Sequence, residues 1–309
     1  MLDTPFSLSR RGALKLTLIF LLGQVAFGII VGFVGGLAKA TGSSLPEWAS
    51  TGNPVMLSLG NISAAFIVLG YGLCQTKSRA SELFVLSAPP PKIFALLLFT
   101  LGGYVALHSE FSNVFSWMVP PPQWLRRFTA PMHDLAQHPW SGPFALVVMA
   151  PLTEELVFRG LILRRLLASV PAWTAIWTSA LLFMGMHLNP WQFPIALGSG
   201  LLMGWIYARS RSLALCFVAH AFINATSLLA AGLPFTIRGF NTSPASGEVV
   251  FQPWWVDLGG AAVLATGLYL FTRTTPPLPS PPVRPEPPLL PVEISPLPAA
   301  APDSALPTA

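Results

Sequence analysis

The sequence predicts an all-α, polytopic membrane protein with about eight transmembrane helices. Its 309 residues are 53% hydrophobic and only 9% charged, and the mean hydropathy is +0.62. A soluble domain carries roughly 25% charged residues. Two adjacent glutamates, Glu154 and Glu155, interrupt one of the apolar runs. Each charge at the centre of a membrane helix costs about 2.5–3.5 kcal/mol, so the pair indicates chemistry or a conduction path inside the membrane.

Apolar runs of about 20 residues, the length that spans a hydrocarbon core of about 30 Å, recur along the chain. The expected spans are 14–37, 55–73, 93–108, 143–168, 171–187, 191–208, 212–231 and 254–272. A tight turn at 188–191 separates the fifth span from the sixth. The first span is too long for the apolar part of a signal peptide, and we expect it to remain as an anchor.

The basic residues indicate how the spans are oriented. If the N-terminus is cytoplasmic, thirteen of the 17 Lys and Arg residues fall on that side: Arg10, Arg11, Lys15, Lys77, Arg79, Lys92, Arg159, Arg164, Arg165, Arg209, Arg211, Arg273 and Arg284. The other four are Lys39, Arg126, Arg127 and Arg238. This bias predicts cytoplasmic N- and C-termini in an integral membrane protein, which we expect in the bacterial inner membrane. Because the basic residues form short clusters between apolar runs, they predict contact with the lipid bilayer and no nucleic-acid partner.

The chain divides into four segments. Residues 1–142 hold three spans and an outer loop, 109–142, whose tryptophans and paired arginines predict a segment lying on the membrane interface. Residues 143–231 hold the polar clusters described below. Residues 232–273 hold an outer loop and the last span. Residues 274–309 contain 13 of the 32 prolines and are expected to be an extended, disordered tail.

The two glutamates are expected to differ in role. On an α-helix, Glu155 and Arg159 are four residues apart and share a face, which predicts an ion pair. Glu154 is rotated from that face by about 100° and lacks such a partner. We therefore expect Glu155 to hold the helix with Arg159 and Glu154 to act as a free base. Pro151 removes a backbone donor and is expected to kink the helix or open it locally.

Two further clusters lie on other expected helices. Phe183 and His187 are four residues apart, and so are His220 and Asn224. At a rise of about 1.5 Å per residue from the cytoplasmic turns, Glu154, His187, His220 and Asn224 lie roughly 12–24 Å deep. A single membrane histidine is more often a packing residue, and a Glu–Arg pair can be purely structural. The agreement in depth across three helices favours one site inside the membrane.

These residue types suit peptide-bond hydrolysis. Glu154 would take a proton from water, and His187 would orient that water or pass a proton onward. His220 and Asn224 would donate hydrogen bonds to the developing oxyanion. The sequence contains neither the G-x-S-x-G motif nor the HExxH zinc signature. A ligand set of Glu154, His187 and His220 nevertheless matches one catalytic zinc arrangement, so a divalent metal stays open as a cofactor.

The three motifs, in this order on separate helices, resemble the signature motifs of the CPBP family. This family comprises the CAAX prenyl endopeptidases and bacteriocin-processing enzymes, also called Abi proteins, and the resemblance covers residues 143–231. It implies a CAAX-type intramembrane endopeptidase acting on a peptide or membrane-protein substrate. Its catalytic residues would be Glu154, Glu155, His187, His220 and Asn224, supported by Arg159 and Phe183. Family members are catalogued as metalloproteases, while a glutamate mechanism without metal is also argued for one branch.

Two other classes of function remain open. A transporter or proton-coupled carrier would use Glu154 and Glu155 as a relay. Inverted repeats favour a transporter, but the first half of the chain holds no second Glu-Glu motif. A non-catalytic immunity or scaffold protein is the other alternative. The substrate is equally open between a bacteriocin precursor, a regulatory membrane protein and a prenylated protein.

Overall fold

The computed structural model describes residues 8–76, 89–122, 138–242 and 249–280, and all regular structure in these ranges is helical. The all-α prediction is therefore confirmed. The helices are α1 (Arg10–Ala40), α2 (Pro54–Thr76), α4 (Pro91–Met118), α9 (Ala172–Met186), α10 (Phe193–Ser210), α11 (Leu213–Gly232) and α12 (Trp254–Thr274), with a short 3₁₀ segment, η1 (Glu47–Ala49). A further helix, here named the central helix, joins α6 (Ser141–Pro143), η2 (Phe144–Met149), α7 (Ala150–Glu155), η3 (Leu156–Leu163) and α8 (Arg164–Leu166) without a break.

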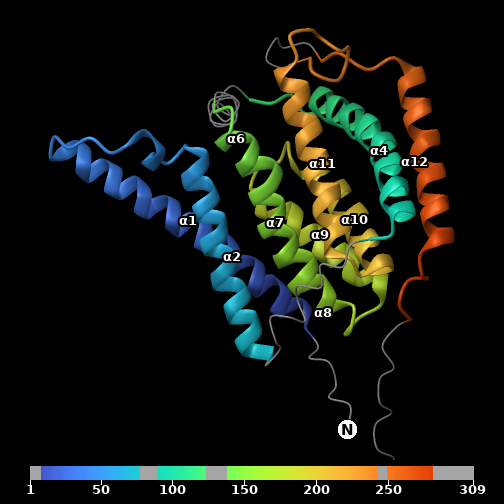
Figure 1. The fold of residues 1–309 in the computed structure, drawn as a ribbon, viewed down its shortest axis with the longest axis horizontal. Helices are drawn as coiled ribbons and strands as arrows, with labels where there is room; N and C mark the ends of the chain where they lie inside the picture. The colour runs from blue at the N-terminus through green and yellow to red at the C-terminus, as the bar shows by residue number, and fades with distance from the viewer. Residues whose placement is uncertain (1–7, 77–88, 123–137, 243–248, 281–309) are drawn as a thin grey trace, which may run out of the picture.

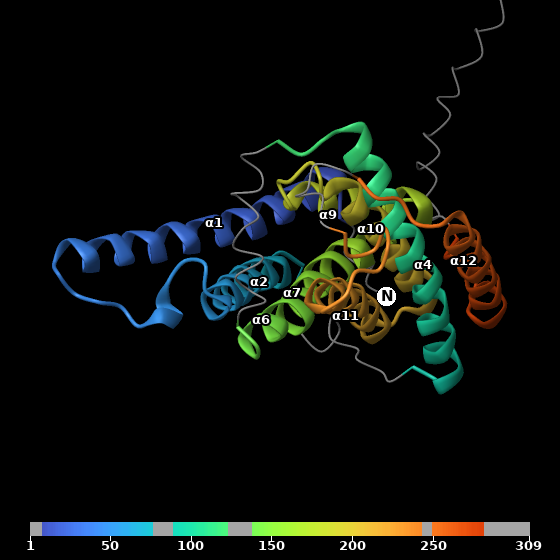
Figure 2. The ribbon, with the colours of Figure 1, turned by 90° about the horizontal axis from the view of Figure 1, so that it is seen from above.

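Most of the helices run up and down beside one another, and α1 lies obliquely to them (Figure 1). The central helix, α9, α10 and α11 form the middle of the molecule, with the α4–α12 pair on one flank and the α1–α2 pair on the other. The view from above in Figure 2 shows the same order and shows α1 extending well beyond the other helices. Within the described ranges, five helices, α1, α2, α4, α11 and α12, are long and apolar enough to cross a membrane. The structure thus agrees with a polytopic membrane protein.

Local sequence signals explain where several helices begin and turn. The Ser9 side chain accepts a hydrogen bond from Gly12 N at 3.1 Å and so caps α1. Ser212 caps α11 in the same way by accepting from Leu215 N at 3.3 Å. The predicted turn at 188–191 is present, since Asn189 Oδ1 accepts from Trp191 N at 3.1 Å and Leu188 has a φ of 51°. This turn returns the chain from α9 into α10.

Helix α4 is longer than the span expected at 93–108, because it continues to Met118. Its added turns carry polar side chains that make hydrogen bonds with the loop before α12. Gln252 N donates to Glu110 Oε2 at 2.9 Å, and Asn113 Nδ2 donates to Gly239 O at 2.6 Å. The sequence becomes polar at this point without leaving the helix, so hydropathy alone misplaced the end. Most of the remaining predicted interfacial loop lies outside the described residues, including Trp124, Arg126 and Arg127. The same is true of Lys77, Arg79 and Arg284, and of residues 281–309 of the predicted disordered tail.

The central helix is the most deeply buried element around the glutamates. Within η3, the side chains of Val157, Phe158, Leu161 and Ile162 are fully buried. This segment contacts α2, α9, α10 and α11. The helix that carries the glutamates is therefore held by neighbours on several sides.

The central helix contains two wide π segments, η2 and η3, on either side of the six-residue α7. In η2 the Ala150 N–H donates to Ala145 O, five residues earlier, and in η3 the Arg164 N–H donates to Arg159 O in the same pattern. Pro151, two residues after the end of η2, has no N–H to contribute to the ladder. The local opening expected near Pro151 is thus present as π turns, and the helix does not break there.

Candidate active site

The predicted site residues come from three elements that pack together. Glu154 and Glu155 end α7, and Arg159 lies in η3. Phe183 is on α9, whose C-cap is His187, and α11 carries His220 and Asn224. Glu154 is 8% exposed, Glu155 2% and His220 7%, and Arg159 is fully buried. An isolated buried charge is strongly unfavourable, so the partners of each group decide how stable its charged form is.

Glu155 is the centre of the charged contacts. Its Oε1 accepts a hydrogen bond from Arg159 Nη1 at 2.8 Å, which confirms the ion pair predicted from the spacing of four residues. The same oxygen lies 2.8 Å from His220 Nδ1. The sequence prediction did not include this second contact, which joins α7 to α11. Glu155 therefore holds both its own helix and the orientation of a histidine from another helix.

Arg159 is fixed on three sides. Besides the contact with Glu155, its Nη2 donates to Gly200 O on α10 at 3.2 Å. Its guanidinium lies over the Phe183 ring, with Cζ 4.7 Å from the ring centroid. A planar guanidinium can donate in two directions while stacking on a ring, and a lysine ammonium cannot. Arg159 thereby links the central helix to both α9 and α10.

The contact with Glu155 also determines how the His220 ring presents its second nitrogen. A carboxylate oxygen only accepts, so His220 Nδ1 must carry the proton in this hydrogen bond. Nε2 then faces Glu154, with 3.9 Å between Nε2 and Glu154 Oε2. This distance is too long for a direct hydrogen bond and is compatible with one water oxygen bonded to both atoms.

Glu154 and Glu155 have the different surroundings that their helical positions predicted. The Glu154 side chain is 11% exposed and the Glu155 side chain 2%. Among the described residues, the Glu154 carboxylate has no hydrogen bond, whereas Glu155 Oε1 has two. Both oxygens of Glu154 are thus free to accept, whereas in Glu155 only Oε2 lacks a hydrogen bond, and that oxygen is fully buried. Its role as a base remains a prediction.

The Phe183 ring contacts both aromatic and basic side chains of the site. The rings of His187 and His220 lie edge to face with it, at centroid distances of 4.9 and 5.7 Å. The Phe158 ring packs on it in the same way at 5.2 Å. His187 is held by a hydrogen bond of 2.8 Å from Nδ1 to Phe183 O, which leaves Nε2 as an acceptor in the neutral ring. No hydrogen bond or ion pair between His187 and either glutamate occurs in the described part of the chain.

Asn224 connects α11 to the central helix. Its Nδ2 donates to Leu146 O at 2.8 Å. Leu146 lies in the π segment η2, so the amide holds a turn that precedes the glutamates. One N–H of the Asn224 amide makes this bond, and the second remains for another acceptor.

Comparison with known proteins identifies the segment that carries these residues. Residues 136–226 match the family model described as Type II CAAX prenyl endopeptidase Rce1-like. Residues 136–226 are thus similar to this family, and they are called the Rce1-like domain below. The domain includes every predicted site residue and agrees with the resemblance to the CPBP family that the three motifs indicated. No curated protein and no solved structure matches the chain.

The donors of the Rce1-like domain do not group as a metal site. Among the residues that the structure describes, no three His, Cys, Asp or Glu side chains are arranged to hold a metal ion. His187 Nδ1 is bonded to Phe183 O, and His220 Nδ1 to Glu155 Oε1. The set of Glu154, His187 and His220 that the sequence left open for zinc is therefore not brought together as three ligands.

Two contacts of the Rce1-like domain could not be found from the sequence, and a third left only a signal in residue spacing. Gly200 and Leu146 act through backbone carbonyls, which carry no signal in residue type. Ser179 donates its hydroxyl to Phe158 O at 3.3 Å. A serine four residues before Phe183 was the available signal for this contact, because that spacing places both on one face of a helix.

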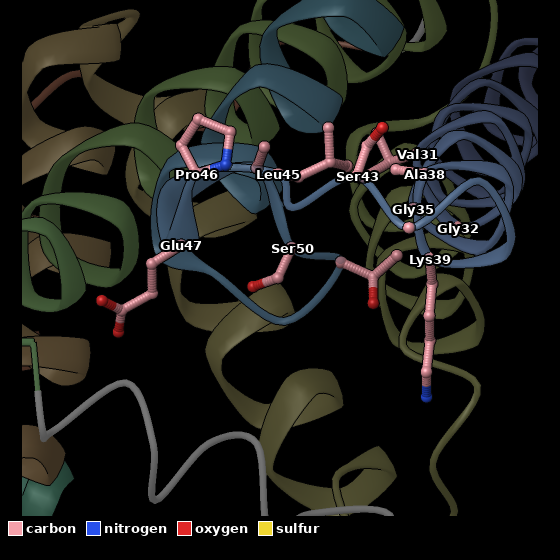
Figure 3. Close-up of a pocket in the computed structure, with 13 residues that line it drawn as sticks. Val31, Gly32, Gly35, Ala38, Lys39, Ser43, Leu45, Pro46, Glu47 and Ser50 are labelled. Carbon is pink, nitrogen blue, oxygen red and sulfur yellow. The ribbon is translucent and has the colours of Figure 1, made fainter.

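A hollow of about 580 Å³ lies apart from the Rce1-like domain, between the C-terminal part of α1 and the segment around η1 (Figure 3). Its lining includes Gly32, Gly35, Lys39, Glu47 and Ser50. None of the predicted site residues lines it. The hollow therefore gives no support to the predicted chemistry.

Proposed function

We propose that the protein is an intramembrane endopeptidase that hydrolyses a peptide bond of a peptide or membrane-associated protein. One observation carries the proposal. His220 is bonded to Glu155 through Nδ1, and this contact turns Nε2 toward Glu154 Oε2 at 3.9 Å. A carboxylate with free acceptor capacity thus faces a ring nitrogen from another helix inside an apolar protein. The Rce1-like domain at residues 136–226 supports a CAAX-type protease as the class of enzyme.

Glu154 acts as the general base in this proposal. A water bonded to Glu154 Oε2 gives its proton to the carboxylate as its oxygen attacks the carbonyl carbon of the peptide bond. The new C–O bond converts the carbonyl into a tetrahedral oxyanion. Glu154 then returns the proton to the amide nitrogen, the C–N bond breaks, and an acid and an amine are formed. His187 Nε2, free as an acceptor, orients the attacking water.

His220 and Asn224 stabilise the oxyanion. Protonated His220 donates from Nδ1 to Glu155 and from Nε2 toward the substrate oxygen. Asn224 contributes the amide N–H that is not bonded to Leu146 O. Donors held in place before the reaction are effective because they need no reorganisation as charge develops. The contacts of Glu155 with Arg159 and His220 supply this rigidity.

A peptide ending in a prenylated Cys-aliphatic-aliphatic-X sequence is the proposed substrate class. The description of the matching family names such a substrate. A site buried between apolar helices also suits a substrate that carries a lipid into the membrane. The substrate class is separate from the reaction, since a site of this kind can also cut an unprenylated membrane protein.

The reaction is tested by comparing native membranes that contain the wild-type protein or Glu154→Gln. New protein termini are mapped by mass spectrometry in both samples. We expect some new termini to occur only with the wild type. The corresponding uncleaved substrate proteins should remain bound to the Glu154→Gln variant. Identical termini in the two samples, with both proteins present at equal levels, would contradict a protease.

A further inference from the structure

We propose that Ser179 is a positioning residue of this site, which holds the π turn that follows the two glutamates. This inference rests on the proposed function and adds a residue that lies in none of the three sequence motifs. Ser179 is on α9 and 1% exposed. Its hydroxyl donates to Phe158 O in η3 at 3.3 Å.

The π segments determine where the glutamates point. A π turn contains one residue more than the corresponding α turn, which rotates the residues beyond it by about 100° relative to those before it. Glu154 and Glu155 lie in α7, between η2 and η3. If η3 relaxed to an α pattern, Arg159 and its partners would change their position relative to Glu155. The site therefore needs the π turns to be held.

Each π segment is held by a side chain from a helix that also supplies a histidine. Asn224 of α11 donates to Leu146 O in η2 at 2.8 Å, and the same helix carries His220. Ser179 of α9 donates to Phe158 O in η3 at 3.3 Å, and His187 follows the same helix. The two hydrogen bonds lie on opposite sides of the glutamates along the chain. Ser179 is thus the counterpart of Asn224 at the second π segment.

The bond from Ser179 is unusual for a helical hydroxyl. Serine and threonine inside helices commonly donate to the carbonyl four residues earlier in their own helix. The neighbouring Thr178 does this, with Oγ1 2.7 Å from Thr174 O. Ser179 instead donates across the helix interface to Phe158 O. This hydrogen bond gives Phe158 O a donor from outside its own helix and so ties η3 to α9.

Ser179 acts on the site through its neighbours. Ser179, Phe183 and His187 are spaced four residues apart and share one face of the helix. The carbonyl that Ser179 holds belongs to Phe158, whose ring packs on Phe183. The next residue is Arg159, which binds Glu155 and lies over Phe183. Loss of the hydroxyl is therefore expected to reach His220 through Arg159 and Glu155.

The test compares Ser179→Ala with Thr178→Val, a control that removes a hydroxyl from the adjacent residue. Both full-length proteins are placed in liposomes with a farnesylated peptide ending in Cys-aliphatic-aliphatic-X. We expect Ser179→Ala to lower kcat by about threefold to tenfold, which is the rate change that the loss of one hydrogen bond produces. KM should be unchanged. Thr178→Val should keep the wild-type kcat. Equal kcat values for the two variants, or a loss confined to KM, would overturn the proposal.

A second readout does not depend on activity. The ¹⁵N resonance of His220 Nδ1 reports its hydrogen bond to Glu155. We expect Ser179→Ala to shift this resonance and Thr178→Val to leave it in place. If the wild type does not cleave this peptide, the proposed substrate class fails, while the His220 resonance still decides the positioning role. An unshifted resonance in Ser179→Ala would overturn that role.

Discussion

The imidazole Nδ1 of His220 lies 2.8 Å from Glu155 Oε1, although the two residues are 65 positions apart in the chain. This contact joins α11 to the central helix and fixes one ring nitrogen. The ion pair with Arg159 already explains why the charge of Glu155 is buried. The contact with His220 gives Glu155 a second role. The acid that holds the helix also orients the histidine that faces Glu154.

Glu155→Gln is expected to destabilise the protein. The change removes the negative charge that Arg159 and His220 share, and breaking a buried pair from one side costs about 3–5 kcal/mol. Glu154→Gln is the matched control, because no hydrogen bond to the Glu154 carboxylate occurs in the described residues. Thermal unfolding in detergent measures the difference. Equal midpoints for the two variants would show that Glu155 is not a structural acid.

Asn224→Ala is expected to lower both stability and catalysis. It removes the donor to Leu146 O and the proposed donor to the oxyanion, and loss of one oxyanion donor costs about 10²–10³ in kcat. Asn241→Ala is a close control, since Asn241 Nδ2 also donates to backbone carbonyls, those of Ala230 and Phe235. The control should lose stability and keep kcat. A similar kcat in both variants would remove Asn224 from the oxyanion site.

Arg159→Lys tests the shape of the cation, since it preserves the charge. A lysine cannot bind Glu155 and Gly200 O together while stacking on Phe183. We expect a loss of about 1–3 kcal/mol in unfolding free energy, because a buried carbonyl or carboxylate oxygen loses its donor. Arg273→Lys, in the exposed last turn of α12, is the control and should behave as the wild type. Equal unfolding midpoints would mean that charge alone matters at Arg159.

Metal removal provides a further prediction. The described residues contain no group of three metal-ligating side chains, and the proposed steps use only the chain's own groups. We expect the purified protein to keep its activity after dialysis against a strong chelator. Loss of activity on dialysis, followed by recovery with added zinc, would contradict the glutamate mechanism.

Interactions within one helix were predictable from the sequence. The spacing of Glu155 and Arg159 predicted their ion pair, and the rotation of about 100° between neighbours predicted that Glu154 would lack that partner. Matching depths predicted that three helices would meet. These predictions hold because helical geometry is regular, so residue spacing determines which side chains share a face.

Interactions between helices were less predictable. The contact of His220 with Glu155 depends on how α11 and the central helix are rotated relative to each other, and no spacing within either helix determines this. Asn224 binds Leu146 O, and a backbone carbonyl is the same in every residue type. The end of α4 was misplaced because Glu110 and Asn113 are polar yet satisfied by a distant loop. Such partners become visible only in three dimensions.

The most direct test of the central claim is the cleavage rate of Glu154→Gln in liposomes with the farnesylated Cys-aliphatic-aliphatic-X peptide. Glu47→Gln, at an exposed glutamate in η1 away from the site, is the control. Removal of a general base lowers the rate by about 10²–10⁴. We expect this loss in Glu154→Gln, with an unchanged unfolding midpoint and full activity in Glu47→Gln. Cleavage by Glu154→Gln at the wild-type rate would contradict the assignment of Glu154 as the base.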